Sequence, residues 1–262
     1  INGVQQPKID INNDNLLDLA ITGNLYTGSS KTQIYLNENG ILNLNNSQPQ
    51  MANVYGGHLS FVDYNNGGFL DISMSGLATI DFSTFTALLL YKWESGNYVL
   101  DDDENQLSIT DGYWGGQYNH DWADYDNDGD LDLVSGGISI FDNTNYLTIF
   151  KNNNGILSKD TTQTDLIPLF PCALIWIDIN GDNYKDLLTL GRLQLNGVSH
   201  MYINDGMGKL IKSSDQPFEI PSILHAISVG DHNSDGYDDI AIAHLNGTEM
   251  HTNIYTLSLI HI

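Results

Sequence analysis

Cysteine, proline and long apolar runs are scarce in this sequence. Cys172 is the single cysteine among 262 residues, so no disulfide can form within the chain. No apolar run reaches the roughly 18 residues of a membrane-spanning helix, which excludes such a span. Proline occurs six times, and no stretch of helical length shows the 3.6-residue apolar period of an amphipathic helix. A chain of this kind needs another staple if it is to be stable outside the cell, and bound metal can supply one.

Basic residues are scarce as well. Nine Lys and Arg stand against 33 Asp and Glu, and the formal net charge is −24. Such a surface should repel nucleic acids and anionic membranes, whose partners are normally basic. The sequence also has no nucleophile elbow, no HExxH and no phosphate-binding glycine loop. A carboxylate pair for glycosidic chemistry stays open among so many acids, but a non-enzymatic protein is expected.

What the sequence does contain is aspartate in a regular pattern. Residues 124–133 read DYDNDGDLDL, with acids at relative positions 1, 3, 5 and 9 and glycine at position 6. Oxygen ligands two residues apart in a tight loop can converge on one hard cation, and Ca²⁺ accepts roughly six to eight oxygens. Glycine permits the backbone conformation that such a turn needs. The apolar/polar alternation that follows is typical of a half-buried strand.

The pattern occurs five times. The copies begin at intervals of 53, 61, 54 and 53 residues, with the first residues Asp10, Asp63, Asp124, Asp178 and Asp231. Of the 33 acids, 17 lie inside these ten-residue segments: three, two, five, three and four in chain order. Composition alone does not explain this spacing, so a repeat architecture is expected.

An EF-hand is the alternative interpretation of an acidic cation loop. It requires a bidentate glutamate at position 12 and a helix on each side of the loop. Position 12 of the four full copies holds residues that cannot ligate in that way: Ile21, Ser135, Thr189 and Ile242. Strand-like residues follow every loop, so the EF-hand is excluded.

A glycine turn is the second landmark of the repeat. It lies 30, 33, 31 and 30 residues after the first aspartate of its loop, at Gly40, Gly96, Gly155 and Gly208. Asn-Gly and Ser-Gly between apolar runs favour hairpins. Apolar segments flank both the loop and the turn, which gives four short strands per repeat; examples from different repeats are residues 58–62 for the first strand, 131–134 for the second, 146–150 for the third and 155–157 for the fourth. The sequence therefore predicts an all-β chain of four-stranded antiparallel blades, a β-propeller.

The loops and their flanks resemble the FG-GAP/VCBS calcium-loop repeats of integrin α-subunit propellers and of many bacterial surface proteins. Residues 122–136 give the closest match, and the resemblance covers about residues 4–256. It implies that each loop joins the first and second strands of a blade. It also implies that Ca²⁺ is held by the side chains at positions 1, 3, 5 and 9 and by the backbone carbonyl at position 7.

The resemblance assigns metal ligands residue by residue. In the first loop they are Asp10, Asn12, Asp14, Leu16 and Asp18; in the second Asp63, Asn65 and Asp71; in the third Asp124, Asp126, Asp128, Asp130 and Asp132; in the fourth Asp178, Asn180, Asp182, Tyr184 and Asp186; and in the fifth Asp231, Asn233, Asp235, Tyr237 and Asp239. Gly67 removes the position-5 ligand of the second loop. About four to five Ca²⁺ ions are therefore expected, the second site being short of one ligand.

A single propeller domain is expected over residues 1–262. Its repeats are placed at about residues 1–50, 51–110, 111–166, 167–219 and 220–262. The chain begins and ends inside a repeat, and propellers of the resembled family often have seven blades. The five repeats are therefore either a ring closed by its own termini or part of a longer ring.

Two functions from different classes follow. The first is a calcium-binding propeller at the cell surface or outside the cell, where millimolar Ca²⁺ fills loops of modest affinity. There it would mediate adhesion, recognise a protein or glycan ligand, or pack with neighbouring subunits. The second is a lectin-like propeller or the accessory domain of a polysaccharide-degrading enzyme. Exposed tryptophans would favour the second function, and the candidates are Trp93, Trp114, Trp122 and Trp176.

Overall fold

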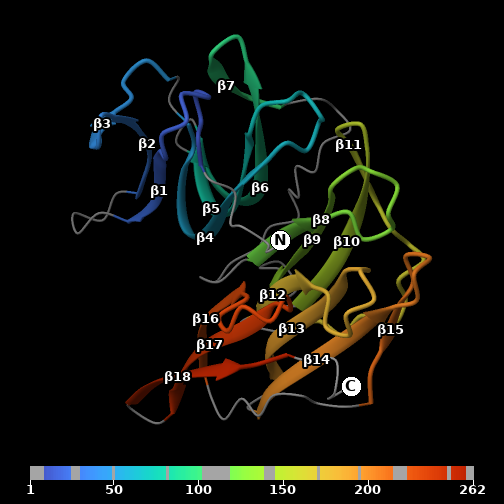
Figure 1. The fold of residues 1–262 in the computed structure, drawn as a ribbon. Helices are drawn as coiled ribbons and strands as arrows, with labels where there is room; N and C mark the ends of the chain where they lie inside the picture. Colours follow the sequence, from blue (N-terminus) through green and yellow to red (C-terminus); the bar gives the residue numbers. More distant parts are fainter. Residues whose placement is uncertain are drawn as a thin grey trace.

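The fold was analysed in a computed structural model. It describes residues 9–24, 30–48, 51–80, 83–101, 119–138, 145–169, 172–193, 196–214, 223–246 and 249–257. These residues form 18 strands and, over the same ranges, no helix (Figure 1). Within them, accordingly, no helix is long and apolar enough to cross a membrane.

The strands form five antiparallel sheets in chain order. Blade 1 has three strands, β1 (Leu19–Asn24), β2 (Ser30–Glu38) and β3 (Ile41–Leu44). Blade 2 has four, β4 (Asn53–Val62), β5 (Asp71–Ile80), β6 (Ser83–Glu94) and β7 (Asn97–Leu100). Blade 3 also has four, β8 (Asn119–Ala123), β9 (Asp132–Ile138), β10 (Asn145–Asn153) and β11 (Ile156–Lys159).

The last two sheets follow the same plan. Blade 4 consists of β12 (Cys172–Ile177), β13 (Asp186–Leu193), β14 (Asn196–Asn204) and β15 (Leu210–Lys212). Blade 5 consists of β16 (Ile223–Gly230), β17 (Asp239–Asn246) and β18 (Glu249–Tyr255). The first strand expected in repeat 1 and the last strand expected in repeat 5 fall in residues 1–8 and 258–262, outside the described residues.

The glycine turns connect the last two strands of a blade, as the hairpin signal predicts. At Asn39-Gly40, Ser95-Gly96 and Asn154-Gly155 both residues have positive φ, between 49° and 91°. Two consecutive left-handed residues define a type I′ turn, whose twist matches that of paired strands. Such turns set the register that follows, in which Glu38 pairs with Ile41 and Glu94 with Asn97.

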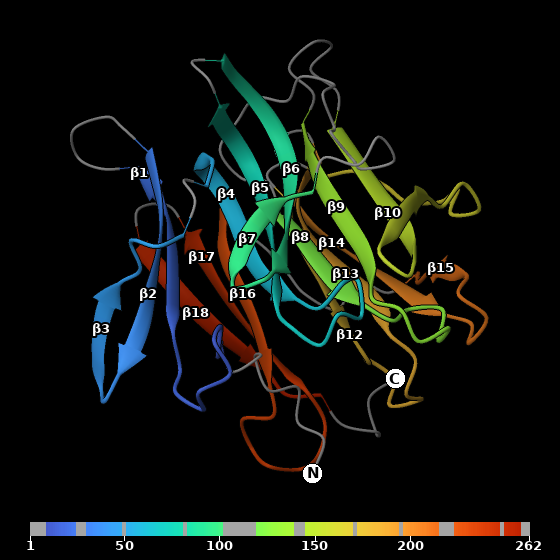
Figure 2. The ribbon, with the colours of Figure 1, turned by 90° about the horizontal axis from the view of Figure 1, so that it is seen from above.

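The sheets follow one another around a common axis, and the two views show the same order of blades (Figures 1 and 2). The first strands β4, β8, β12 and β16 contact one another in turn. Separate apolar cores fill the spaces between successive sheets, from blades 1 and 2 to blades 4 and 5. The molecule is a five-bladed β-propeller, which confirms the all-β propeller expected from the repeats. The limits of the repeats and the single domain stay predictions.

Candidate metal centre

The aspartate loops and the glycine turns lie at the same end of the sheets. In blades 2 to 5 each loop joins the first and second strands, and antiparallel strands bring the turn after the third strand back to that end. The turn of one blade also reaches the loop of the blade before it. A Cβ atom at Gly155 would lie 3.1 Å from Asn65 Cβ, and one at Gly208 would lie 2.8 Å from Asp126 Cβ. The second and third loops are therefore held by their own blade and by the next one.

The position-1 aspartate closes every loop in the same way. One carboxylate oxygen accepts the backbone N–H of position 5, at distances of 2.8 to 3.1 Å. The other accepts the backbone N–H of position 6, at 2.8 to 3.1 Å. The residues concerned are Asp10, Asp63, Asp124, Asp178 and Asp231. Five loops of different sequence thus share one backbone shape.

Two positions of each loop require left-handed backbone. Position 6 has φ between 67° and 98° and holds Asn15, Gly68, Gly129, Asn183 and Gly236. Position 4 has φ between 57° and 75° and holds Asn13, Asn66, Asn127, Gly181 and Ser234. Glycine and asparagine tolerate this region best. The importance of position 4 was missed from the sequence, although four of its five residues are Asn or Gly.

The third loop gathers the most charge. Ligand oxygens of Asp124, Asp126 and Asp128 all lie within 4.8 Å of one another, and among the described residues this is the one acidic group of its kind. In the first, fourth and fifth loops position 3 is an asparagine, whose amide donates to the position-5 carboxylate at 2.9 to 3.0 Å. The third loop thus brings three of its predicted ligand side chains together, and the first, fourth and fifth loops bring the position-3 and position-5 side chains into contact.

The residues fit a hard cation. Asp126 Oδ1 is buried and has no hydrogen-bond partner among the described residues, so one oxygen of the group is left for a ligand that the protein does not supply. The other oxygen, Oδ2, accepts a hydrogen bond of 2.7 Å from Lys151 Nζ. A buried carboxylate oxygen without a partner is costly, and a cation bound to it removes that cost. The donor set is oxygen only, as Ca²⁺ prefers.

The position-9 aspartates lie beneath the loops and are buried, with exposures from 0% to 7%: Asp18, Asp71, Asp132, Asp186 and Asp239. Their Oδ1 atoms accept a backbone N–H from the third strand or the residues just after it, at 2.7 to 2.9 Å. In four of them Oδ2 accepts the N–H of position 2. This aspartate therefore fastens the loop to the sheet, whatever it contributes to a cation.

Burial changes the ionisation of these acids. It raises the pKa of Asp132 to about 7, partly opposed by the hydrogen bond from Asn152, while the negative charges of Asp126 and Asp128 raise it further. Burial likewise raises the pKa of Asp186 to about 6 and that of Asp71 to about 7. The carboxylates of one loop therefore repel one another, which a bound cation would relieve.

The second loop differs from the others. Gly67 stands at position 5, and its N–H bonds Asp63 and Asn65 at 2.8 Å each. The loop keeps the common backbone without the position-5 carboxylate. Asp71 Oδ2 is buried and no hydrogen bond of ordinary geometry reaches it among the described residues, although the backbone N–H groups of Tyr64 and Asn65 lie near enough to lower the pKa of Asp71.

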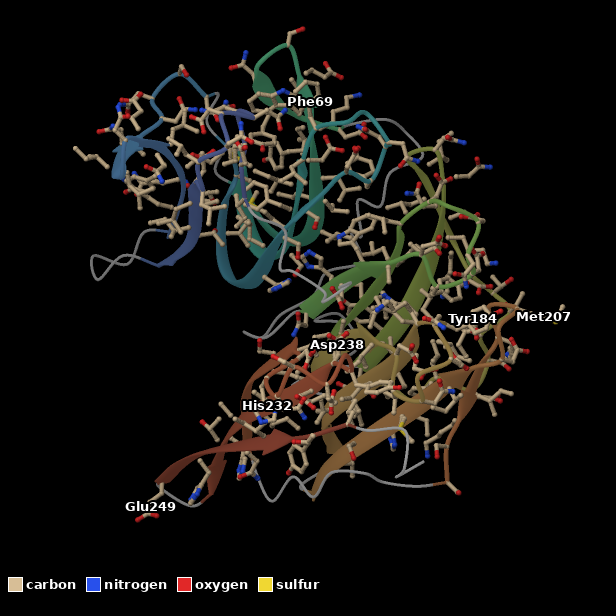
Figure 3. The ribbon with its side chains drawn as sticks, in the orientation of Figure 1. Phe69, Tyr184, Met207, His232, Asp238 and Glu249 are labelled. Atoms are coloured by element: carbon tan, nitrogen blue, oxygen red, sulfur yellow. The ribbon has the colours of Figure 1, made fainter. Side chains whose placement is uncertain are left out.

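The position-7 side chains of the third and fourth loops make contacts outside the ligand group. The carboxylate of Asp130 accepts hydrogen bonds from Asn66 Nδ2 at 2.6 Å and from the N–H of Asn154 at 2.8 Å. A Cβ at Gly206 would lie 3.0 Å from the ring of Tyr184, which lies beside Met207 at the edge of blade 4 (Figure 3). Neither side chain points to a ligand role, in keeping with an expected ligand on the backbone.

Two asparagines that the sequence analysis did not single out connect neighbouring loops. Asn152 Nδ2 donates to the carbonyls of Tyr64 at 2.7 Å and Leu131 at 2.9 Å. Asn204 Nδ2 donates to the carbonyls of Tyr125 at 2.7 Å and Lys185 at 3.0 Å. Each amide thus ties its own loop to the loop of the preceding blade. Both asparagines lie at the end of the third strand of their blade, and this repeated position in the sequence could have identified them.

The comparisons with known proteins bear on these repeats. The FG-GAP-like repeat model matches residues 124–189 and 178–242, which hold the third, fourth and fifth loops. A search of the curated proteins found no match. Among solved structures, one titled "Glycoside hydrolase" is similar at 14% identity and a TM-score of 0.46, and a complex of BT0996 with RGII in its title is similar at 12% and 0.44. In both cases the match covers 91% of this chain and 86% of the other.

Proposed function

Because the chain carries FG-GAP-like repeats on a five-bladed propeller, we propose that it is a calcium-binding propeller that works outside the cell or at its surface. Its loops would hold Ca²⁺ as a structural ion, and its role would be adhesion, recognition of a ligand or assembly rather than catalysis. The observation that carries the proposal is the third loop. There three carboxylates converge and Asp126 Oδ1 is buried without a partner among the described residues.

Calcium suits the loops better than other common cations. The converging groups offer carboxylate and amide oxygens without histidine or cysteine at positions 1, 3 and 5, which disfavours zinc. The position-3 ligand differs between loops, Asp126 in the third and asparagine in the others, and Ca²⁺ accepts such varied oxygen sets, whereas Mg²⁺ demands near-ideal octahedral geometry. Four of the five loops keep both position-3 and position-5 oxygens.

A structural role follows from where the loops lie. Each loop is tied to its own sheet through the position-9 aspartate, and the second and third loops also contact the glycine turn of the next blade. A cation that fixes such a loop therefore fixes a blade-to-blade contact, and its binding energy becomes folding energy. Extracellular Ca²⁺ is concentrated enough to keep such sites filled, which supports a location outside the cell.

The acids also support a non-enzymatic role. The position-1 and position-9 carboxylates accept backbone N–H groups inside their own loop or sheet. A general acid or base must reach a substrate proton, and these groups are already directed at the protein.

Metal stoichiometry after removal and return of calcium tests the proposal. Protein stripped with EDTA and dialysed against millimolar CaCl₂ should regain about four to five ions per chain. Asp124→Ala and Asp178→Ala should each remove one ion and lower the melting temperature more in calcium than in EDTA, where only the loop-closing hydrogen bonds are lost. Unchanged stoichiometry in both variants would overturn the assignment.

One observation favours carbohydrate binding as a second candidate. Phe69, in the second loop, is 44% exposed and stacks on Trp93 with ring centroids 6.2 Å apart (Figure 3). Exposed, supported aromatic faces are suited to stacking against sugar rings. Trp176 is buried in the core, and Trp114 lies outside the described residues. Glycan-array binding that Phe69→Ala abolishes would support this candidate, and release of reducing ends would show an enzyme instead.

A further inference from the structure

Asn152 joins two cation loops through one buried amide. Its side chain is 2% exposed, and Nδ2 donates to the carbonyl of Tyr64 in the second loop and to the carbonyl of Leu131 in the third. Its Oδ1 accepts the N–H of Gly155 at 2.8 Å, so both polar atoms of the side-chain amide are bonded. The amide therefore cannot move without breaking a hydrogen bond in one of the two loops.

The carbonyls that this amide binds lie between ligand positions. Tyr64 is position 2 of its loop, between the expected ligands at positions 1 and 3, and Leu131 is position 8 of the next loop, between those at positions 7 and 9. A cation that fixes either set of ligands therefore fixes the carbonyl between them. Asn204, which is also 2% exposed, repeats the arrangement one blade further on. It joins position 2 of the third loop to position 8 of the fourth.

The other boundaries between adjacent loops lack this amide. The residue at this place in each blade is the one whose backbone N–H binds Oδ1 of the position-9 aspartate: Asn37, Trp93, Asn152, Asn204 and Leu257. Trp93 and Leu257 have no side-chain amide, so this link is missing between the first and second loops and between the fourth and fifth. Asn37 donates to Leu17 of its own loop and accepts from Gly40, and it bonds no other loop among the described residues.

The third loop is therefore the centre of a group of three linked loops. Asn152 connects it to the second loop and Asn204 connects it to the fourth. The second and third loops share one more bond, of 2.6 Å, from Asn66 Nδ2 to Asp130 Oδ1. Asn66 and Asp130 are positions 4 and 7 of their loops, so this bond also joins parts of the chain that surround expected ligands.

We propose that the second, third and fourth loops bind Ca²⁺ cooperatively, and that Asn152 and Asn204 are the positioning residues that couple them. The inference rests on the proposed calcium sites. An ion in one loop orders the amide and, with it, a carbonyl between two ligands of the next loop, so the next ion has less backbone to order. Coupling of this kind changes affinity by about fivefold or more. Charge alone predicts the opposite sign, because dications in adjacent loops repel each other.

Hydrogen exchange with mass spectrometry tests the coupling, because it gives a calcium midpoint for each loop separately. The full chain is stripped with EDTA, and the protection of the peptides from each loop is measured against free calcium. Asp124→Ala removes the third ion and leaves both asparagines in place. It should raise the calcium midpoint of the fourth loop about fivefold or more, and that of the second loop in the same direction.

Asp231→Ala is the matched control, since the fifth loop also follows the fourth but has Leu257 where the amide would be. It should not raise the calcium midpoint of the fourth loop. In an Asn204→Ala background, Asp124→Ala should no longer shift that midpoint, because the link is already cut. Asn37→Ala loses the same bonds within its own blade and should leave the effect of Asp124→Ala on the fourth loop intact.

Circular dichroism in EDTA shows whether each variant is folded. Asp124→Ala changes a half-buried loop residue, so it keeps the coupling testable if Asn204→Ala does not fold. An unchanged fourth-loop midpoint in Asp124→Ala would overturn the coupling, and so would an equal rise in Asp231→Ala. If no loop of the unmodified chain gained protection with calcium, the proposed function would fail and this inference with it.

Discussion

The Oδ1 atom of Asp186 accepts a hydrogen bond of 2.7 Å from the backbone N–H of Asn204, 18 residues further along the chain. The second oxygen accepts the N–H of Ile179 at 3.0 Å. One buried carboxylate thus joins the fourth loop to the second and third strands of its blade. Asp186 therefore attaches the loop to the sheet, whereas Asp178 closes the loop on its own backbone.

Asp186→Ala should lower the free energy of unfolding both with and without calcium. It leaves two buried N–H groups without acceptors, at a cost of about 2–4 kcal/mol. Asp182 is the matched position, since it is an exposed acid of the same loop. Asp182→Ala should cost less than about 1 kcal/mol in EDTA and show its main effect in calcium. Urea unfolding in both conditions measures this, and equal effects of the two variants in EDTA would contradict it.

Gly208→Ala should damage a loop in a different blade. The new Cβ would lie 2.8 Å from Asp126 Cβ, and the backbone at Gly208 has a φ of +78°. Backbone strain and the displaced third loop should together cost about 2–3 kcal/mol and weaken Ca²⁺ binding there. Gly96→Ala is the control, because its φ is +91° and a Cβ would meet nothing within 4 Å. The free energy of unfolding of Gly96→Ala should fall by about 1 kcal/mol, with calcium binding unchanged. If Gly96→Ala weakened calcium binding as much as Gly208→Ala, the contact between Gly208 and the third loop would not be the cause.

The sequence specifies much of this fold because the loop chemistry and the strand period are local. Asp124 closes its loop on residues four and five positions later, so the aspartate spacing alone predicts that turn. The partner of the position-9 aspartate was not predictable, because it offers only a backbone N–H. That partner is Trp93 in one blade and Leu257 in another, so no residue type marks it. The exposure of Leu19 and Ile254, at 37% and 57%, was not predictable either, because both follow the same apolar alternation as residues that are buried in other blades.

Stability should fall as pH rises from about 4 to 6, and Asp121 should contribute to this. Burial raises its pKa from 3.8 to about 6, against hydrogen bonds from the N–H groups of Trp176 and Trp122. The unfolded chain loses this proton at lower pH than the folded chain does. The stabilising contribution of protonated Asp121 is therefore fully present below pH 3.8 and is lost as the pH rises through about 6. The loss is roughly 3 kcal/mol.

The Asp121→Asn variant isolates this contribution. Asparagine does not titrate, so the slope of stability against pH should be shallower than in the unmodified chain. Urea unfolding of both proteins at several pH values gives the two slopes. The measurements are made in EDTA, so that the loop acids are metal-free in both proteins. Parallel slopes would show that Asp121 ionises alike in the folded and unfolded states.

Lys151→Gln should strengthen calcium binding at the third loop. The Lys151 ammonium lies 2.7 Å from Asp126 Oδ2 and opposes a dication at the same carboxylates. Its side chain is 41% exposed, so the ion pair itself adds at most about 1 kcal/mol to stability. Removing the charge should raise affinity about three- to tenfold at low ionic strength and less in high salt.

The binding step to follow is the one that Asp124→Ala abolishes in a calcium titration. Lys159→Gln removes the same charge from an exposed position on β11 of the same blade, so any general effect of net charge appears equally in that control. If both variants shift the affinity alike, Lys151 acts only through overall charge. A larger shift in Lys151→Gln that diminishes with added salt would place its ammonium in direct competition with the cation for Asp126.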